Sequence, residues 1–140
     1  MEKVEENKDK SQEVIFPKGK YFQAVGRRKR AIARIKLYNG KGEVIYNKKK
    51  PAKINSVWIE PITLLSLKNK FDIVITVSGG GKMSQAEAVR MAVSRALDKF
   101  DAKLHTSLRM AGFLTRDPRE KERKKPGLRR ARRAPQWAKR

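Results

Sequence analysis

The chain has 140 residues, of which 36 are Lys or Arg and 14 are Asp or Glu, and its net charge of +22 is too high for an ordinary soluble enzyme. With 39% hydrophobic residues the chain can form one modest core, and the absence of cysteine excludes disulfides, thiolate metal sites and cysteine nucleophiles. No apolar run approaches the roughly 18 residues of a membrane-spanning helix, and the start lacks the apolar stretch of a signal peptide. We therefore expect a cytoplasmic protein with no membrane partner.

The distribution of charge predicts three parts. Residues 1–20 hold five acids and five lysines with almost no apolar pattern, which is typical of a disordered leader. Residues 21–115 have 19 cations, 6 acids and nearly all the apolar periodicity, so we expect them to form the globular domain. Residues 116–140 have 12 cations, 3 acids and no core-forming pattern, which predicts an extended basic tail. Such a distribution indicates a polyanionic partner.

Four segments have the composition or alternation of β-strands. Residues 21–25 are β-prone and predict a short opening strand. In residues 31–37 small or apolar side chains alternate with mostly basic ones, which predicts a strand with one buried and one basic face. Residues 38–40, Tyr-Asn-Gly, predict a hairpin turn whose returning strand is residues 43–46. The clearest alternation, in residues 71–77, predicts a strand that ends at three glycines.

Helical signals follow and precede that last strand. Ser84 and Glu87 have the spacing of a capping box, so we expect a helix to begin at Ser84 and to continue to Phe100. A second helical stretch ends near Gly112, and a further short helix opens with Pro61 in its first position. Together the elements predict an α+β fold, a two-layer sandwich of three or four strands with two or three helices on one face.

A run of four cations lies between the first two predicted strands. Gly26 is followed by Arg27, Arg28, Lys29 and Arg30. A turn would splay these side chains toward a phosphate backbone, to which Arg offers a planar fork. A solvated charged turn is the alternative, although like charges in a row repel one another. We interpret the run as a polyanion contact.

Three glycines lie at a strand-to-helix junction, where backbone amides and a helix N-terminus can hold a phosphate. Gly79, Gly80 and Gly81 are followed by Lys82, but Met83 stands where a Walker loop has Ser or Thr. A tight turn and an RNA-backbone contact both explain the glycines, and the two interpretations stay open at this point.

Catalytic residues are scarce in this sequence. His105 is the only histidine, and no pair among the acids stands out as a metal-binding or acid–base constellation. We therefore expect no enzyme, no catalytic residue, no metal site, no cofactor and no small-molecule substrate.

The tail carries the densest charge in the chain. Half of residues 123–140 are Lys or Arg and none is acidic, while Pro126, Gly127 and Pro135 argue against one continuous helix. Trp137 offers a stacking face for a base or ribose. A solubilising tail is the alternative, yet a run this basic binds nucleic acid at moderate salt.

Several segments, in order along the chain, have a distinctive wording, and the ending is the most specific of them. They are residues 26–31, 79–81, 85–86, 95–97, 111–119, 122–125, 127–128, 131–136 and 139–140. Together these segments resemble one known family, that of small ribosomal subunit protein nine in its bacterial or organellar type.

The resemblance implies a structural, non-enzymatic protein of the small-subunit head with an S5-domain-2-like fold. Its domain would pack on the 3′ major domain of 16S rRNA beside neighbouring head proteins, and its tail would thread through rRNA toward the anticodon stem-loop of peptidyl-site tRNA. The residues expected to contact tRNA are Lys139 and Arg140. Those expected to contact rRNA are Arg27, Arg28, Lys29, Arg30, Arg34, Gly79, Gly80, Gly81, Lys82, Arg116, Arg119, Arg123, Lys124, Lys125, Arg129, Arg130, Arg132 and Arg133.

Two other functions stay open on the sequence alone. A general nucleic-acid packaging protein would have the same composition. A small phosphotransferase that uses the loop of residues 79–81 is an analogy at the level of the fold only.

Overall fold

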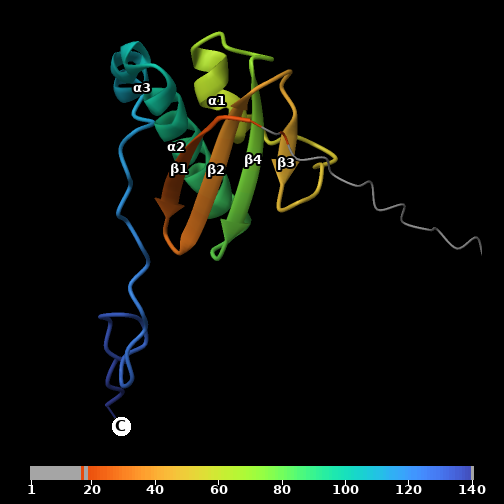
Figure 1. Cartoon of the computed structure of the whole chain (residues 1–140). Coiled ribbons are helices and arrows are strands. Elements are labelled where there is room, and N and C mark those ends of the chain that lie inside the picture. Colours follow the sequence, from red (N-terminus) through yellow and green to blue (C-terminus); the bar gives the residue numbers. More distant parts are fainter. Residues whose placement is uncertain (1–16, 18, 140) are drawn as a thin grey trace, which may run out of the picture.

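The computed structural model describes residues 17 and 19–139, so most of the predicted leader and Arg140 lie outside the described residues. One four-stranded sheet has the spatial order β1-β2-β4-β3, with antiparallel pairing except between β3 and β4, which run parallel (Figure 1). The elements in chain order are β1 (Tyr21–Arg28), β2 (Ala31–Asn39), β3 (Val44–Tyr46), α1 (Ser56–Leu64), β4 (Phe71–Ser78), α2 (Lys82–Phe100), a 3-10 turn η1 (Ala102–Leu104) and α3 (His105–Met110).

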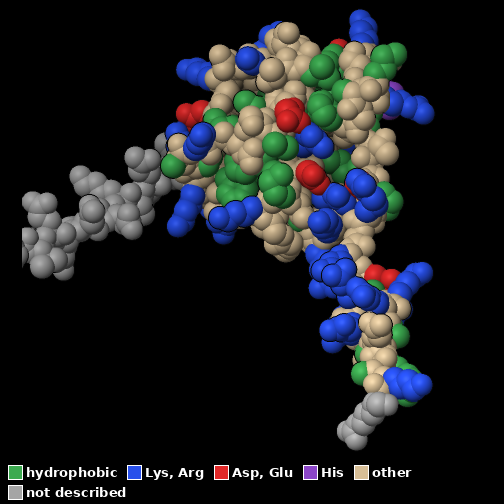
Figure 2. Space-filling view, turned by 180° about the vertical axis from the view of Figure 1, so that it is seen from behind, with side chains coloured by type: hydrophobic (Ala, Val, Ile, Leu, Met, Phe, Trp, Pro, Cys, Tyr) green, Lys and Arg blue, Asp and Glu red, His purple; other side chains and the backbone are tan. Residues whose placement is uncertain are grey.

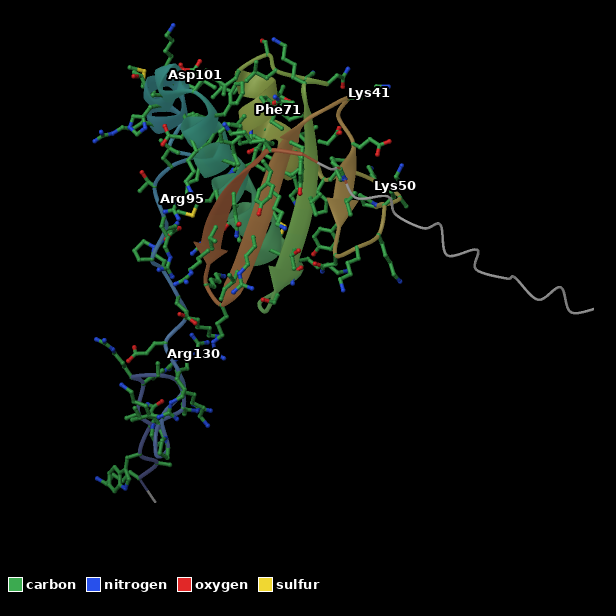
Figure 3. The ribbon with its side chains drawn as sticks, viewed as in Figure 1. Lys41, Lys50, Phe71, Arg95, Asp101 and Arg130 are labelled. Carbon is green, nitrogen blue, oxygen red and sulfur yellow. The ribbon has the colours of Figure 1, made fainter. Side chains whose placement is uncertain are left out.

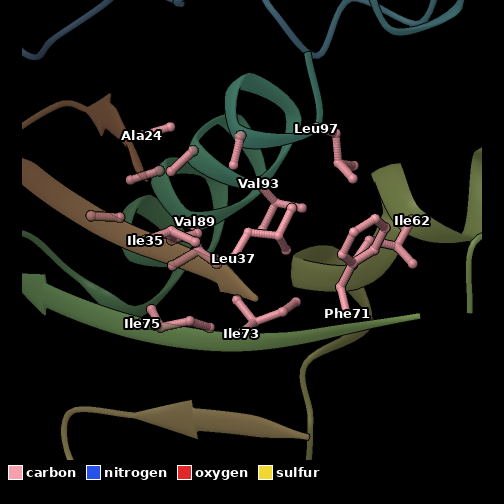
Figure 4. Close-up of a cluster of buried hydrophobic side chains, with 14 of the residues drawn as sticks. Ala24, Ile35, Leu37, Ile62, Phe71, Ile73, Ile75, Val89, Val93 and Leu97 are labelled. Atoms are coloured by element: carbon pink, nitrogen blue, oxygen red, sulfur yellow. The ribbon is translucent and has the colours of Figure 1, made fainter. Parts of the chain in front are cut away.

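The helices lie on one face of the sheet, and the core fills the space between the two layers (Figures 1 and 4). On β2 the predicted alternation is present, since Ile35 and Leu37 are fully buried. Arg34 and Lys36, which alternate with them on the helix-free face, are exposed. From α2, Val93 and Leu97 complete the same core with no exposed surface. The predicted α+β class and the buried faces of the two long inner strands are therefore confirmed.

A glycine in β1 sets how closely α2 approaches the sheet. A Cβ built on Gly26 would collide with the Ala88 carbonyl oxygen and lie 2.7 Å from the Ala92 nitrogen, so no larger side chain fits at this position. Small residues on α2 and a glycine on β1 thus let backbone pack on backbone.

The predicted hairpin between residues 31–37 and 43–46 is wrong. Both edges of β2 are already taken by β1 and β4, and β3 pairs instead with β4, Val44 opposite Ile73. The cause is Asp72, whose Oδ1 accepts the backbone N–H groups of three successive residues at 2.8–2.9 Å and so draws the loop past the start of β4. Those donors are Lys41, Gly42 and Glu43.

The end of β1 and the start of α2 also differ from the predictions. β1 continues through Arg28, so only Lys29 and Arg30 form the turn to β2. The proposed capping box is wrong, because α2 begins at Lys82 after Gly81, and Glu87 is bound by Arg28 from another element.

The prediction for the start of α1 is also wrong, whereas the prediction for the end of α3 is confirmed. α1 begins at Ser56 and is capped by Asn55, whose Oδ1 accepts the Val57 N–H at 3.0 Å, so Pro61 lies inside the helix rather than at its first position. The helical stretch predicted to end near Gly112 is confirmed, since α3 ends at Met110 and Gly112 has φ +74°.

Candidate nucleic-acid interface

The cationic turn and the glycine loop lie at the same end of the sheet. Gly79 and Gly80 have φ of +71° and +65°, and a Cβ on Gly80 would lie 2.8 Å from the Ala31 Cβ at the start of β2. A Cβ on Gly79 would lie 2.6 Å from the Arg30 carbonyl oxygen. The fold brings the two predicted motifs together here, and the tight turn needs glycine whatever the loop contacts.

Exposed cations surround this junction. Lys29 and Lys82 are exposed, and the Arg30 side chain keeps 84% of its surface. The N-terminus of α2 opens at the same place with no acidic residue in its first turn and no side-chain cap, so its partial positive charge is not neutralised. Arg27 and Arg34 are exposed on the helix-free face of β1 and β2.

Arg28 differs from its neighbours, although the sequence grouped it with them. Its side chain is 14% exposed, and its Nε donates to Glu87 Oε2 at 2.6 Å. Its other nitrogens contact Asp117 Oδ2 at 3.2 Å and donate to the Arg119 carbonyl at 2.7 Å. The signal was available in the strand period, because Ala24, Gly26 and Arg28 alternate onto the helix-facing side of β1.

The start of the tail is bound to the domain. Asp117 receives a bidentate contact from the Arg119 guanidinium at 2.8–3.1 Å and its backbone N–H at 2.9 Å. These hydrogen bonds hold the pKa of Asp117 well below its ordinary value. Because the folded-state pKa is lowered, the contacts are at full strength above the ordinary carboxyl pKa and are lost only as pH falls through the lower one.

A pocket of about 250 Å³ lies beside these contacts. Arginines from three parts of the chain line it, and its two acids, Glu87 and Asp117, both hold Arg28. The lining arginines are Arg27, Arg28, Arg90, Arg116 and Arg119. The pocket is therefore cationic and polar, and it joins the end of β1 to the start of the tail.

Beyond Glu120 the described chain contains no helix or strand and runs away from the domain (Figure 1). Its cations are exposed through Lys139, as is Trp137 with 81% of its surface, and Figure 2 shows Lys and Arg gathered where the tail leaves the domain and along it. Figure 3 shows Arg130 in the tail away from Arg95 on α2.

Acidic partners in the tail were missed from the sequence. Glu120 accepts from Arg30 at 3.2 Å, and Glu122 pairs with Lys125 and Arg132, each at 2.9 Å. The signal was the position of the acids, since the three acids of residues 116–140 all fall in its first seven residues. Residues 123–139 therefore hold cations that no acid of their own segment can neutralise.

Other kinds of site are not found in the part of the chain that the structure describes. No helix within residues 19–139 has the length and apolar content to span a bilayer. No three His, Asp or Glu side chains among the described residues lie close enough to share a metal ion. The single histidine, His105, contacts Asp98 at 2.8 Å on the surface between α2 and α3.

The sequence from the cationic turn to the end of the tail matches one protein family. Residues 26–140, far more than half of the chain, match ribosomal protein S9/S16. The match includes the exposed cations of the β1–β2 turn and those of the tail. Proteins of this family are structural, generally non-enzymatic components of the cytoplasmic ribosome. The chain therefore belongs to the ribosomal protein S9/S16 family and is a structural protein of the small ribosomal subunit.

Proposed function

We propose that this protein anchors on 16S rRNA through the end of the sheet that carries the cationic turn, and that its tail follows rRNA to peptidyl-site tRNA. In this proposal residues 21–115 are the domain, with an S5-domain-2-like fold, and residues 116–140 are the tail. Other proteins of the small-subunit head are the neighbours of the domain. The observation that carries the proposal is the exposed surplus charge of residues 123–139, which have eight cations and no acid, with Glu122 as the partner of Lys125 and Arg132. This charge continues the exposed charge of the β1–β2 turn.

The domain contact uses position and shape rather than base sequence. Lys29, Arg30 and Lys82 project from the junction where α2 presents its free N-terminus, so phosphates that approach this end meet side-chain and backbone donors together. Arg27 and Arg34 extend the charge onto the helix-free face of the sheet. Gly79 and Gly80 keep the loop low enough for a backbone to come close.

The tail contact offsets phosphate repulsion where two RNAs converge. Arg123, Lys124 and Lys125, followed by the paired arginines at 129–130 and 132–133, would lie along the rRNA path, and Lys139 and Arg140 would reach the anticodon stem-loop. Arg116 and Arg119 contribute at the start of the tail, beside the cationic pocket. The tail takes its bound conformation from the RNA, as basic segments commonly do.

The sharpest experiment neutralises the tail end without shortening the chain. Small subunits reconstituted with Lys139→Gln and Arg140→Gln are expected to bind peptidyl-site tRNA about fivefold more weakly, which corresponds to about 1 kcal/mol. Incorporation into the subunit, measured by co-sedimentation, should not change.

The matched control removes two exposed lysines from the opposite end of β4. Lys68→Gln and Lys70→Gln change the net charge by the same amount and should leave tRNA affinity unchanged. If the two pairs of substitutions have the same effect at every salt concentration, the tail end has no specific contact with tRNA. A chain that binds duplex DNA tightly and is not enriched in small subunits would instead be a packaging protein.

A further inference from the structure

The first residues after α3 are held to the domain rather than free. Phe113 and Leu114 pack against the core cluster, and the Arg90 guanidinium lies 5.2 Å from the centre of the Phe113 ring. Arg90 is itself fixed, because it donates to Glu60 of α1 at 2.9 Å. The chain after α3 therefore lies against α2, and Phe113 is already part of the lining of the cationic pocket.

At the pocket, one side chain links the tail to two elements of the domain. Arg28 starts on β1, binds Glu87 of α2, and also binds the Asp117 carboxylate and the Arg119 carbonyl of the tail. A guanidinium has five donors in a rigid plane, so it can hold three groups at fixed angles at once. A second link follows immediately, from Arg30 to Glu120.

We infer that Arg28 is a positioning residue which, through Asp117, fixes where and in which direction the tail leaves the domain. The inference deepens the proposed function of the tail and rests on it. The segment of residues 113–120, here called the tail root, is ordered before RNA binds, and the chain that follows RNA begins at Lys121. Those last residues can reach about 65 Å when fully extended.

An ordered tail root lowers the conformational entropy that is lost when the tail binds RNA. Each residue that is already ordered adds no further loss of conformational freedom when the tail binds, so a defined exit direction raises the fraction of chains that start on the correct path. Arg28 thus contributes to RNA binding without contacting a phosphate, because its guanidinium is already held by Glu87, Asp117 and the tail backbone.

Because Asp117 is negatively charged, a positioning role and simple electrostatics predict opposite changes in RNA affinity when it is removed. Asp117→Ala removes a negative charge from a segment that binds a polyanion, so charge alone predicts tighter RNA binding. A positioning role predicts weaker binding, because the root becomes disordered. Glu122→Ala makes the same change in charge beyond the root, where only tail residues are its partners, and it is the matched control.

The decisive measurement is made on the full chain without RNA. Since the sequence has no cysteine, spin labels can be placed at Thr106→Cys on α3 and Lys121→Cys at the end of the root, two exposed positions. We expect a narrow distance distribution that broadens about twofold in Asp117→Ala, as a released segment samples more positions. Glu122→Ala should keep the narrow distribution.

A charge-preserving change tests Arg28 itself. Arg28→Lys keeps the net charge but cannot bridge Glu87, Asp117 and the Arg119 carbonyl together, so it should broaden the distribution as Asp117→Ala does. Arg27→Lys, at the exposed neighbouring position, should have no effect. If Arg28→Lys prevents folding, Asp117→Ala still decides, because its side chain lies outside the core.

The outcomes separate this inference from the proposed function. A distribution that stays narrow in Asp117→Ala overturns the positioning role, whatever the RNA results are. If Asp117→Ala broadens the distribution and also weakens tRNA binding to reconstituted subunits, the result supports both proposals. If Asp117→Ala makes tRNA bind more tightly, the positioning role is overturned. A broadened distribution combined with unchanged tRNA affinity of the Lys139→Gln and Arg140→Gln variant supports the positioning of the root and overturns the tRNA contact.

Discussion

The domain and the tail are built on opposite principles, although both are basic. In the domain, residues such as Ile35, Leu37 and Leu97 have no exposed surface, and hydrogen bonds join distant segments of the chain. From Lys121 to Lys139 no residue is buried, and the contacts join the tail to itself. Apolar burial therefore fixes the conformation of the domain, whereas under the proposed function RNA would fix that of the tail.

The acids show where one principle gives way to the other. Asp117 pairs with Arg28 at the end of β1, and Glu120 pairs with Arg30 in the β1–β2 turn, so both acids hold the tail root to the domain. Glu122 is the last acid in the chain. Beyond it the chain has only cations and neutral residues. This comparison predicts that substitutions rank in opposite orders for folding stability and for RNA binding.

The largest loss of stability is expected for a truncation at the centre of the core. Ile35→Ala should lower the free energy of unfolding by about 2–5 kcal/mol, because it removes buried methyl groups and leaves a cavity between β2 and α2. Urea denaturation followed by circular dichroism measures the change. Ile54→Ala, at a residue that is 42% exposed, is the control and should change stability far less. Equal effects at the two sites would mean that the core is not where it is placed here.

The next largest effect is expected at the close approach of α2 to β1. Gly26→Ala should destabilise the protein by about 1–3 kcal/mol, since the new methyl group meets the Ala88 carbonyl and the Ala92 nitrogen rather than flexible side chains. Gly81→Ala introduces the same group where no atom lies within 4 Å and should cost about 0.5 kcal/mol through the helix cap. Thermal or urea unfolding of the two variants compares them directly.

The same contrast explains how much of the fold could be predicted from the sequence. The alternation of side chains depends only on the strand itself, so the buried faces of β2 and β4 were predicted correctly. Pairing depends on distant partners, so the predicted hairpin failed where Asp72 bound residues about thirty positions away. The capping box failed because Glu87 is held by Arg28, which is 59 residues distant.

The candidate site follows the same rule. The cationic turn and glycine loop could be recognised locally, and their meeting at one end of the sheet follows from the antiparallel pairing of β2 with β4. The strand period places Arg28 on the helix-facing side of β1, but its partners could not be predicted, because Arg119 is 91 residues away. Residue type predicted an affinity for phosphate, and the three-dimensional contacts show which groups hold Arg28 instead.

A smaller effect on stability is expected at the cap of α1. Asn55→Ala should lower the free energy of unfolding by about 1 kcal/mol, because the Val57 N–H loses its side-chain acceptor. Asn55→Ser keeps an acceptor at the cap and should stay within a few tenths of a kcal/mol of the parent. A loss in Asn55→Ser equal to that in Asn55→Ala would assign the effect to something other than the cap hydrogen bond.

The smallest effect on folding should accompany the largest effect on RNA binding. Replacing Arg129, Arg130, Arg132 and Arg133 by Gln should leave the unfolding free energy within about 0.5 kcal/mol, because these side chains are exposed and belong to no core. If each contacts one phosphate, the slope of log affinity against log salt should fall by about 3 for single-stranded RNA. Titrating 16S rRNA fragments at several salt concentrations measures that slope.

Two results would break the comparison between the regions. An unchanged salt slope would mean that the exposed tail arginines do not meet phosphate, and the tail would then be only a solubilising segment. A clear loss of folding stability would mean that the tail is part of the domain's cooperative unit. Ile35→Ala supplies the reciprocal control, because at a temperature where it remains folded its surface cations are unchanged and its salt slope should equal that of the parent protein.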